Sequence, residues 1–144
     1  MTLSDAAFDT AKVRVLVVDD DSALRRMVTM VLEDAGWEFQ EAKDGPEALA
    51  AVRSSPSRLV VLLDWRMPDM SGEEVLDIVV ATPELATRHA YALITANAAA
   101  VTPHLTDLLR LLGAPMVAKP FNIRELLRTV EDQARRINEE EAAS

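Results

Sequence analysis

The sequence predicts a doubly wound α/β fold in three layers, with a five-stranded parallel sheet between two layers of helices. Five short apolar runs alternate along the chain with five longer segments in which apolar residues recur at helical spacing. Parallel neighbours in a sheet need crossover connections, which are usually helices, so this alternation predicts a parallel sheet. The chain has 144 residues, 49% of them hydrophobic, which suits one globular domain with a proper core.

The five predicted strands are runs of apolar, mostly branched residues between turn-forming residues. The run Leu59–Leu63 is apolar throughout, which is typical of a strand buried on both faces. Residues 37–42 alternate only weakly, and we assign Trp37 to packing. The strands are expected at 13–18, 37–42, 59–63, 90–95 and 115–118.

The predicted helices are bounded by caps and breakers. Apolar residues at 24–35 follow the i, i+3, i+4 pattern; Asp21 or Ser22 can cap this helix and Gly36 can end it. The third helix must end by Thr82, because the following proline disfavours helical geometry in the residue before it. The helices are expected at 24–35, 47–53, 72–82, 102–112 and 123–137.

One domain is expected at residues 12–137, between an N-terminal tail at 1–11 and an acidic C-terminal tail at 138–144. The formal net charge of −9 argues against general nucleic-acid binding, which needs a basic surface. The absence of cysteine excludes disulfides and thiolate metal sites. The start of the chain does not resemble a secretory signal, and no apolar stretch has the length of a membrane span, so we expect a cytoplasmic protein without membrane contact.

Polar residues stand where four of the predicted strands end. Asp19 and Asp20 follow the first strand, Asp64 follows the third, Thr95 ends the fourth and Lys119 follows the fifth. Strands of a parallel sheet end at one edge, where ligands bind in open α/β sheets. Carboxylates gathered there repel each other unless a cation compensates, and hard oxygen ligands suit Mg²⁺. A lysine and a threonine hydroxyl can bind phosphate oxygens, so the set predicts a phosphoryl site.

Asp64 is the expected acceptor of the phosphoryl group. It stands alone at the centre of the sheet, whereas Asp19 and Asp20 are adjacent and can share the metal. A carboxylate can attack phosphorus to form an acyl phosphate, while a metal and Lys119 offset the charge of the transferring group. Such a mixed anhydride is labile to water and would act as a timed switch. Taken alone, Asp64 could equally start a turn.

Four motifs between residues 12 and 132 resemble the signatures of bacterial response-regulator receiver domains. They are VVDDDS at 17–22, DWRMPDMSG at 64–72, ITA at 94–96 and VAKPF at 117–121. The resemblance implies a flavodoxin-like sheet with strand order 2-1-3-4-5 and a role in two-component signalling. We expect no enzyme activity beyond the protein's own phosphorylation and dephosphorylation.

The resemblance also implies roles for single residues. Asp64 would take the phosphoryl group from a phosphohistidine of a sensor histidine kinase or of a histidine phosphotransfer protein. Thr95 would bind a phosphoryl oxygen, and Lys119 would pair with the phosphate ahead of a cis bond to Pro120. Gly72 would permit a tight approach into the third helix.

The same resemblance implies the magnesium ligands. Asp20, Asp64 and the backbone carbonyl of Arg66 would coordinate Mg²⁺, and Asp19 would reach it through water.

The chain departs from the receiver pattern at the position where a switch aromatic is usual, which here is Met116. Arg66 and Asn97 flank the path of an attacking water, and Arg66 could shield the phosphoryl group or simply be solvated. We expect His89 and His104 on the surface, and Trp65 at the rim of the site.

The expected function is a stand-alone receiver whose phosphorylation switches protein contacts of the face formed by the helix at 102–112, the strand at 115–118 and the last helix. The expected partners are an unknown downstream protein and, in a phosphorylation-dependent dimer, a second copy of the chain, and no nucleic acid is expected. Alternatives of the same class are a phosphate sink, a relay intermediate, or a receiver cut from a larger protein.

Two alternatives come from other classes. An aspartate-nucleophile phosphohydrolase usually carries a second aspartate two residues after the nucleophile, where this chain has Arg66. A flavodoxin-like nucleotide or flavin binder would need a glycine-rich phosphate loop after the first strand, where the aspartates stand instead.

Overall fold

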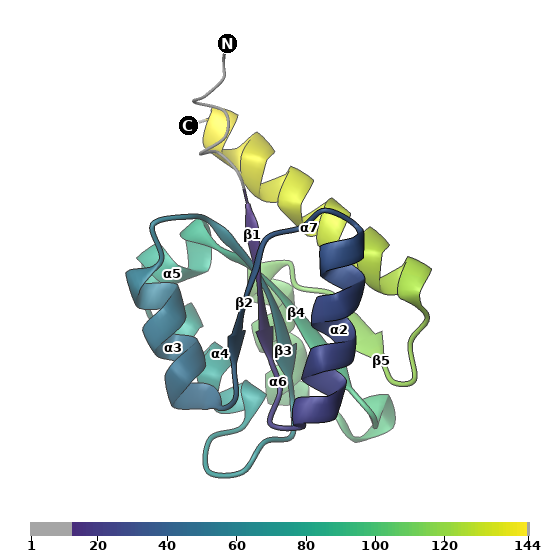
Figure 1. Ribbon diagram of the computed structural model, residues 1–144. Helices are drawn as coiled ribbons and strands as arrows, with labels where there is room; N and C mark the ends of the chain where they lie inside the picture. Colours follow the sequence, from purple (N-terminus) through teal and green to yellow (C-terminus); the bar gives the residue numbers. More distant parts are fainter. Residues whose placement is uncertain (1–12, 144) are drawn as a thin grey trace.

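The computed structural model describes residues 13–143, and their side chains up to residue 138, so the predicted tail at 1–11 lies outside the described residues. Figure 1 shows one sheet between two layers of helices, which confirms the predicted fold class. The sheet has the order β2-β1-β3-β4-β5, and every neighbouring pair is parallel. The strands are β1 (Arg14–Val18), β2 (Phe39–Ala42), β3 (Leu59–Asp64), β4 (Ala90–Thr95) and β5 (Met116–Ala118).

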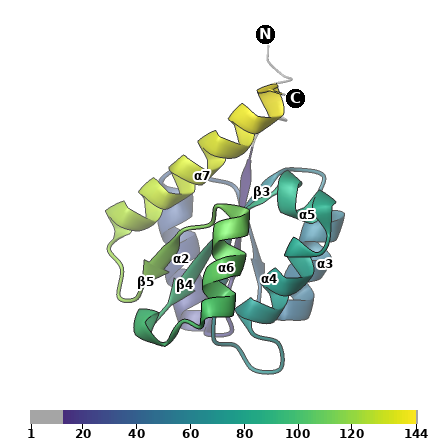
Figure 2. The same ribbon diagram turned by 180° about the vertical axis from the view of Figure 1, so that it is seen from behind.

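Two separate cores lie on the two faces of the sheet. The helices are α2 (Ser22–Asp34), α3 (Gly45–Ser54), α4 (Gly72–Val80), α5 (Pro83–Arg88), α6 (Pro103–Leu112) and α7 (Ile123–Ala143), with a short 3₁₀ turn η1 (Ala98–Ala100). Helices α2 and α7 pack on one face, and α3, α4, α5 and α6 pack on the other (Figures 1 and 2). Every residue of β3 and β4 is buried, and these two packed strands carry Asp64 and Thr95 at their carboxyl ends.

Side-chain caps set the beginning of the helices next to the sheet's carboxyl edge. Asp21 is the N-cap of α2 and accepts hydrogen bonds from the amides of Ala23 and Leu24. Ser71 caps α4 and Thr102 caps α6 in the same way. An N-cap side chain satisfies amides that the first helical turn leaves without partners. These caps fix where each loop at this edge turns into a helix.

The structure differs from the expected elements in three places. An additional helix, α5, follows the expected break at Thr82, with Pro83 in its first turn. Helix α7 continues to Ala143, so the segment expected as an acidic tail is helical over residues 138–143. The second strand is also shorter than expected, because it begins at Phe39 rather than at Trp37. Within residues 13–143, no helix is long and apolar enough to cross a membrane.

His89 is buried, so the prediction that it lies on the surface is wrong. Its Nδ1 accepts a hydrogen bond from the amide of Leu59 at 3.0 Å, and its Nε2 lies 2.9 Å from the carbonyl oxygen of Val52. A neutral ring protonated on Nε2 satisfies both partners. Burial lowers the pKa of His89 to about 4. His104 is exposed as expected, and its Nε2 lies 2.7 Å from Oδ1 of Asp77.

Candidate phosphoryl and metal site

Three carboxylates meet at the carboxyl edge of the sheet. Asp64 is the last residue of β3, while Asp19 and Asp20 follow directly after β1, the neighbouring strand. Each of the three offers a carboxylate oxygen, and these oxygens all lie within 4.8 Å of one another. Asp19 and Asp64 are buried, whereas Asp20 is exposed. The predicted convergence of the three side chains is therefore present, with one open side toward solvent.

Lys119, which directly follows β5, completes the cluster. Its Nζ lies 3.0 Å from Oδ1 of Asp64 and 3.6 Å from Oδ2 of Asp19. The backbone amide of Lys119 donates to the carbonyl of Thr95 at 2.7 Å, which extends the pairing of β4 with β5 up to the site. The Lys119–Pro120 peptide bond is cis, as expected.

The electrostatics of the cluster favour a bound cation. Burial and the nearby carboxylates of Asp19 and Asp20 raise the pKa of Asp64 to about 6, against the lowering effect of its hydrogen bond with Lys119. Burial lowers the pKa of Lys119, but the hydrogen bond to Asp64 and the charges of Asp64 and Asp19 raise it above its ordinary value. Lys119 is thus a cation at neutral pH. Three carboxylates beside one lysine still leave excess negative charge, and oxygen ligands in this number fit a hard divalent cation.

Gly72 allows the first turn of α4 to lie directly against the end of β3. A Cβ atom at this position would lie 2.5 Å from the backbone oxygen of Asp64. The amide of Gly72 donates to the carbonyl of Trp65 at 2.7 Å, which closes the loop that follows the strand. Only a residue without a side chain permits this approach, so Gly72 supports the backbone that carries Asp64.

Thr95 ends β4 next to the cluster and is fully buried. Its neighbour Ile94 pairs with Asp64 in the β3–β4 register. The Thr95 hydroxyl oxygen accepts a hydrogen bond from the amide of Asn97 at 3.0 Å. The hydroxyl therefore keeps its own proton to donate, which a phosphoryl oxygen could accept.

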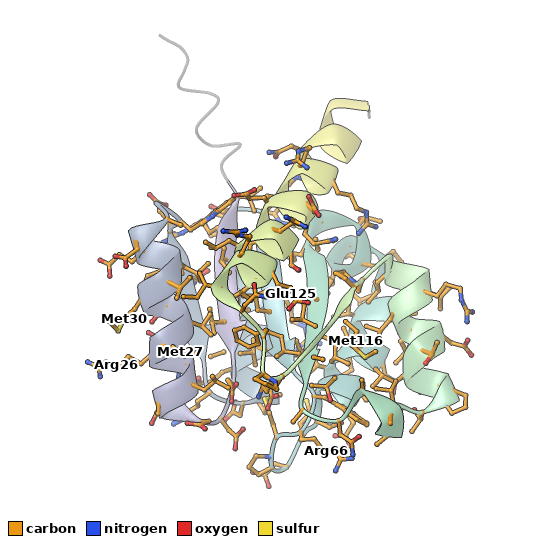
Figure 3. All side chains as sticks on the ribbon, turned by 90° about the vertical axis from the view of Figure 1, so that its right-hand side faces the viewer. Arg26, Met27, Met30, Arg66, Met116 and Glu125 are labelled. Atoms are coloured by element: carbon orange, nitrogen blue, oxygen red, sulfur yellow. The ribbon has the colours of Figure 1, made fainter. Side chains whose placement is uncertain are left out.

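Trp65 does not lie at the rim of the site, where it was expected, and Arg66 stacks on its ring. Trp65 is buried and belongs to the core on the face of the sheet that α3, α4, α5 and α6 cover, so it does not form the rim of the site. Arg66 is exposed (Figure 3). Its guanidinium carbon lies 4.5 Å from the centre of the Trp65 ring. Arg66 is thus a stacked cation two residues beyond Asp64.

Met116 occupies the outer edge strand of the sheet with 42% of its surface exposed (Figure 3). It pairs with Leu93, two residues before Thr95 in β4. A thioether has no hydroxyl tip that could report on the position of Thr95 by exchanging hydrogen-bond partners. The departure noted in the sequence therefore lies on an exposed face next to the site.

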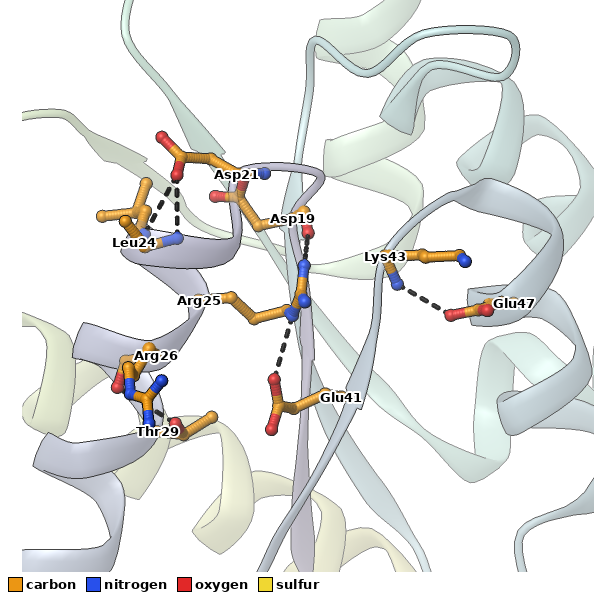
Figure 4. Close-up of polar contacts among 10 residues, drawn as sticks. Asp19, Asp21, Leu24, Arg25, Arg26, Thr29, Glu41, Lys43 and Glu47 are labelled. Carbon is orange, nitrogen blue, oxygen red and sulfur yellow. Dashed lines mark hydrogen bonds and ion pairs between the residues drawn. The ribbon is translucent and has the colours of Figure 1, made fainter.

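No pattern in the sequence indicates the role of Arg25, whose side chain binds the backbone of the acidic loop at residues 19–21. Its Nη1 donates to the backbone oxygen of Asp19 at 2.7 Å, and its Nε donates to Oε1 of Glu41 at 2.9 Å (Figure 4). The side chain of Arg25 is mostly buried between α2 and β2. Arginine stands among the apolar positions of α2 without a local partner, and Glu41 belongs to another element, so no spacing rule indicates this contact.

Comparisons of sequence agree with the geometry of the site. Residues 15–131 match the family described as the response regulator receiver domain. The DNA-binding response regulator MtrA of Mycolicibacterium smegmatis is 37% identical over 135 residues, which cover 94% of this chain and 56% of MtrA. The probable transcriptional regulatory protein TcrX of Mycobacterium tuberculosis is 39% identical over 129 residues, covering 83% of this chain and 48% of TcrX. The chain spans about half the length of these relatives.

Comparisons of structure give the same result. A CheY-like response regulator receiver domain protein from Methanospirillum hungatei superposes with a TM-score of 0.74 at 27% identity, covering 88% of this chain and 97% of that structure. The chemotaxis protein CheY4 of Vibrio cholerae superposes with a TM-score of 0.71 at 32% identity, covering 85% of this chain and 99% of that structure. Both similarities extend over nearly the whole of the compared domain.

Proposed function

Because the chain belongs to the family of response regulator receiver domains, we propose that Asp64 accepts a phosphoryl group. The observation that carries the proposal is the contact of Lys119 Nζ with Asp64 at 3.0 Å beside two further carboxylates. A central carboxylate with an adjacent cation is suited to attack phosphorus. The donor would be a phosphohistidine of a sensor histidine kinase or of a histidine phosphotransfer protein.

The transfer is a displacement at phosphorus. A carboxylate oxygen of Asp64 forms the new O–P bond while the N–P bond to the donor histidine breaks, and the histidine leaves as a neutral ring once it is protonated. Lys119 offsets the negative charge of the transferring group, and the hydroxyl of Thr95 donates to one of its oxygens. Lys119 must then exchange its contact with the Asp64 carboxylate for one with the phosphoryl group.

Magnesium is the cofactor that the three carboxylates fit. Asp20, Asp64 and the backbone carbonyl of Arg66 would hold it, with Asp19 reaching it through water. When bound, Mg²⁺ neutralises charge on the phosphoryl oxygens during transfer. The open side at Asp20 leaves room for the waters that Mg²⁺ retains.

Output would pass through the face formed by α6, β5 and α7, where a downstream protein or a second copy of the chain could bind. Met116 on this face lacks the aromatic ring expected for coupling to Thr95. This favours a phosphate sink or a relay intermediate as the second candidate within the same class. A phosphohydrolase is disfavoured, because Arg66 stands where a general acid would be needed and cannot donate a proton.

The test is chemical phosphorylation with acetyl phosphate and Mg²⁺. The wild-type protein should gain the mass of one phosphoryl group, and hydroxylamine should remove it, as expected for an acyl phosphate. Asp64→Asn should gain nothing. Asp69→Asn is the matched control, since Asp69 lies in the same loop at φ 69°, which asparagine tolerates, and it should be phosphorylated normally. An unmodified wild type, or the same adduct on Asp64→Asn, would contradict the proposal.

A further inference from the structure

We propose that Arg25 is a positioning residue that holds the loop between β1 and α2 so that Asp19 and Asp20 face Asp64 before any cation binds. This inference rests on the proposed function, because it concerns the affinity of the same three carboxylates for Mg²⁺. Arg25 contacts the backbone of this loop and is not itself a ligand of the cation. It acts on the backbone that carries two of the ligands.

Arg25 joins three elements through one planar group. Its backbone lies in the first turn of α2, where its amide donates to the carbonyl of Asp21 at 2.9 Å. Its Nε donates to Glu41 in β2, and its Nη1 donates to the backbone oxygen of Asp19 (Figure 4). A guanidinium presents its donors in a rigid fork, so the two contacts fix each other's direction. The acidic loop is therefore tied to β2 as well as to α2.

The contact with the Asp19 carbonyl determines how the next residue is oriented. This carbonyl belongs to the same planar peptide unit as the amide of Asp20, so fixing its oxygen fixes the plane from which Asp20 departs. The amide of Asp19 donates to Ala42 in β2 at 3.2 Å, so both peptide units around Asp19 are held. Oδ1 of Asp19 in turn accepts from the amide of Asp21 at 2.9 Å. Asp20 is exposed, and its position depends on this backbone.

Charge and position predict opposite effects for the removal of Arg25. A positive guanidinium near the carboxylates opposes a dication, so charge alone predicts tighter Mg²⁺ binding once Arg25 is lost. Glu41 offsets part of this charge through its ion pair with Arg25 at 2.9 Å. A loop that must be ordered at the moment of binding instead weakens the affinity. The sign of the change therefore distinguishes the two causes.

The experiment is calorimetric titration of the full chain with Mg²⁺ alone. Arg25→Ala should bind about tenfold more weakly than wild type, as is common when a residue that orients metal ligands is lost. Arg25→Lys keeps the charge without the fork and should also bind more weakly than wild type. Arg14→Ala is the matched control, because Arg14 in β1 pairs at 3.5 Å with Glu38, which directly precedes β2, at the end of these strands remote from the site. The affinity of this variant for Mg²⁺ should equal that of the wild type.

Hydrogen exchange in the metal-free protein supplies a readout that does not depend on Mg²⁺. The amide of Asp21, which bonds Asp19, should exchange faster in Arg25→Ala than in wild type and in Arg14→Ala. If Arg25→Ala does not fold, Glu41→Ala frees the same side chain from β2 and should show both effects in the same direction.

The Mg²⁺ titration and the hydrogen exchange measurement together separate a failure of the positioning role from a failure of the proposed function. Equal or tighter Mg²⁺ binding by a folded Arg25→Ala protein, or unchanged exchange at Asp21, would overturn the positioning role. A wild type that binds no Mg²⁺ would count against the proposed function, while the exchange of the Asp21 amide would still decide whether Arg25 holds the loop.

Discussion

His89 makes the folded chain sensitive to acid through a single buried ring. The imidazole is 3% exposed, and both of its nitrogens are used by the backbone of β3 and α3 when the ring is neutral. Protonation would place a charge in the core and would turn Nδ1, which accepts from Leu59, into a second donor. This can be tested by comparing the unfolding free energy at pH 8 and at pH 5 for proteins with and without the imidazole ring of His89.

The magnitude follows from the two pKa values. The pKa of His89 is about 4 in the folded chain, against an ordinary value of 6.5. The unfolded chain therefore takes up a proton below pH 6.5 while the folded chain does not. Stability falls as the pH drops through 6.5 and the loss levels off below pH 4. Linkage gives a loss of about 2 kcal/mol in unfolding free energy at pH 5, rising to about 3 kcal/mol at lower pH.

The assay is urea unfolding followed by circular dichroism at pH 8 and pH 5. Both proteins should carry Asp64→Asn, because the raised pKa of Asp64, about 6, makes the fold more stable as the pH falls and would mask the effect. The comparison adds His89→Gln, whose amide can accept from Leu59 and donate to Val52. His89→Gln should lose about 2 kcal/mol less than its parent between the two pH values.

The pH dependence should differ in sign between His89 and His104. Equal losses of stability in both proteins between pH 8 and pH 5 would show that the ring of His89 does not stay neutral in the folded chain. His104 provides the opposite sign, since its hydrogen bond to Asp77 raises its pKa and the folded chain favours the protonated ring. Replacing His104 should therefore increase the loss of stability in acid rather than reduce it.

Three other predictions concern the site and the proposed output face. Lys119→Met should raise the pKa of Asp64 above about 6 in the metal-free protein, because the hydrogen bond that lowers it is lost; carboxyl NMR titration measures this, and an unchanged pKa contradicts the contact. Gly72→Ala should destabilise the fold by about 2 kcal/mol through overpacking and slow phosphorylation by acetyl phosphate. Gly36→Ala should also cost stability, because φ is 89° there, but its Cβ meets no neighbour and it lies away from the site, so it should leave phosphorylation unchanged. Met116→Tyr should increase the difference in partner affinity between the two phosphorylation states; equal affinities in both states would refute an output role for this position.

The sequence predicts the sheet and its acidic edge because both depend on local patterns. A short run of apolar, branched residues such as Leu59–Leu63, bounded by turn-forming residues, favours a buried strand, and the polar residue after such a strand emerges at the edge of the sheet. Helix α5 is missed because six residues carry too little periodicity to distinguish a helix from a turn. The burial of His89 and the role of Arg25 could not be predicted, because their partners, Val52 and Glu41, come close to them only in the folded chain.

The length of α7 has a mechanical consequence. Its 21 residues form a rod of about 31 Å, since each helical residue adds about 1.5 Å. Arg136, in its third quarter, donates to the carbonyls of Leu112 and Gly113 at the end of α6, so the two helices are coupled at that point. With this contact as the pivot, the longer arm of α7 is the one that begins at Ile123, four residues after Lys119, so a displacement at the edge of the sheet would reach the far end of the helix reduced and in the opposite direction.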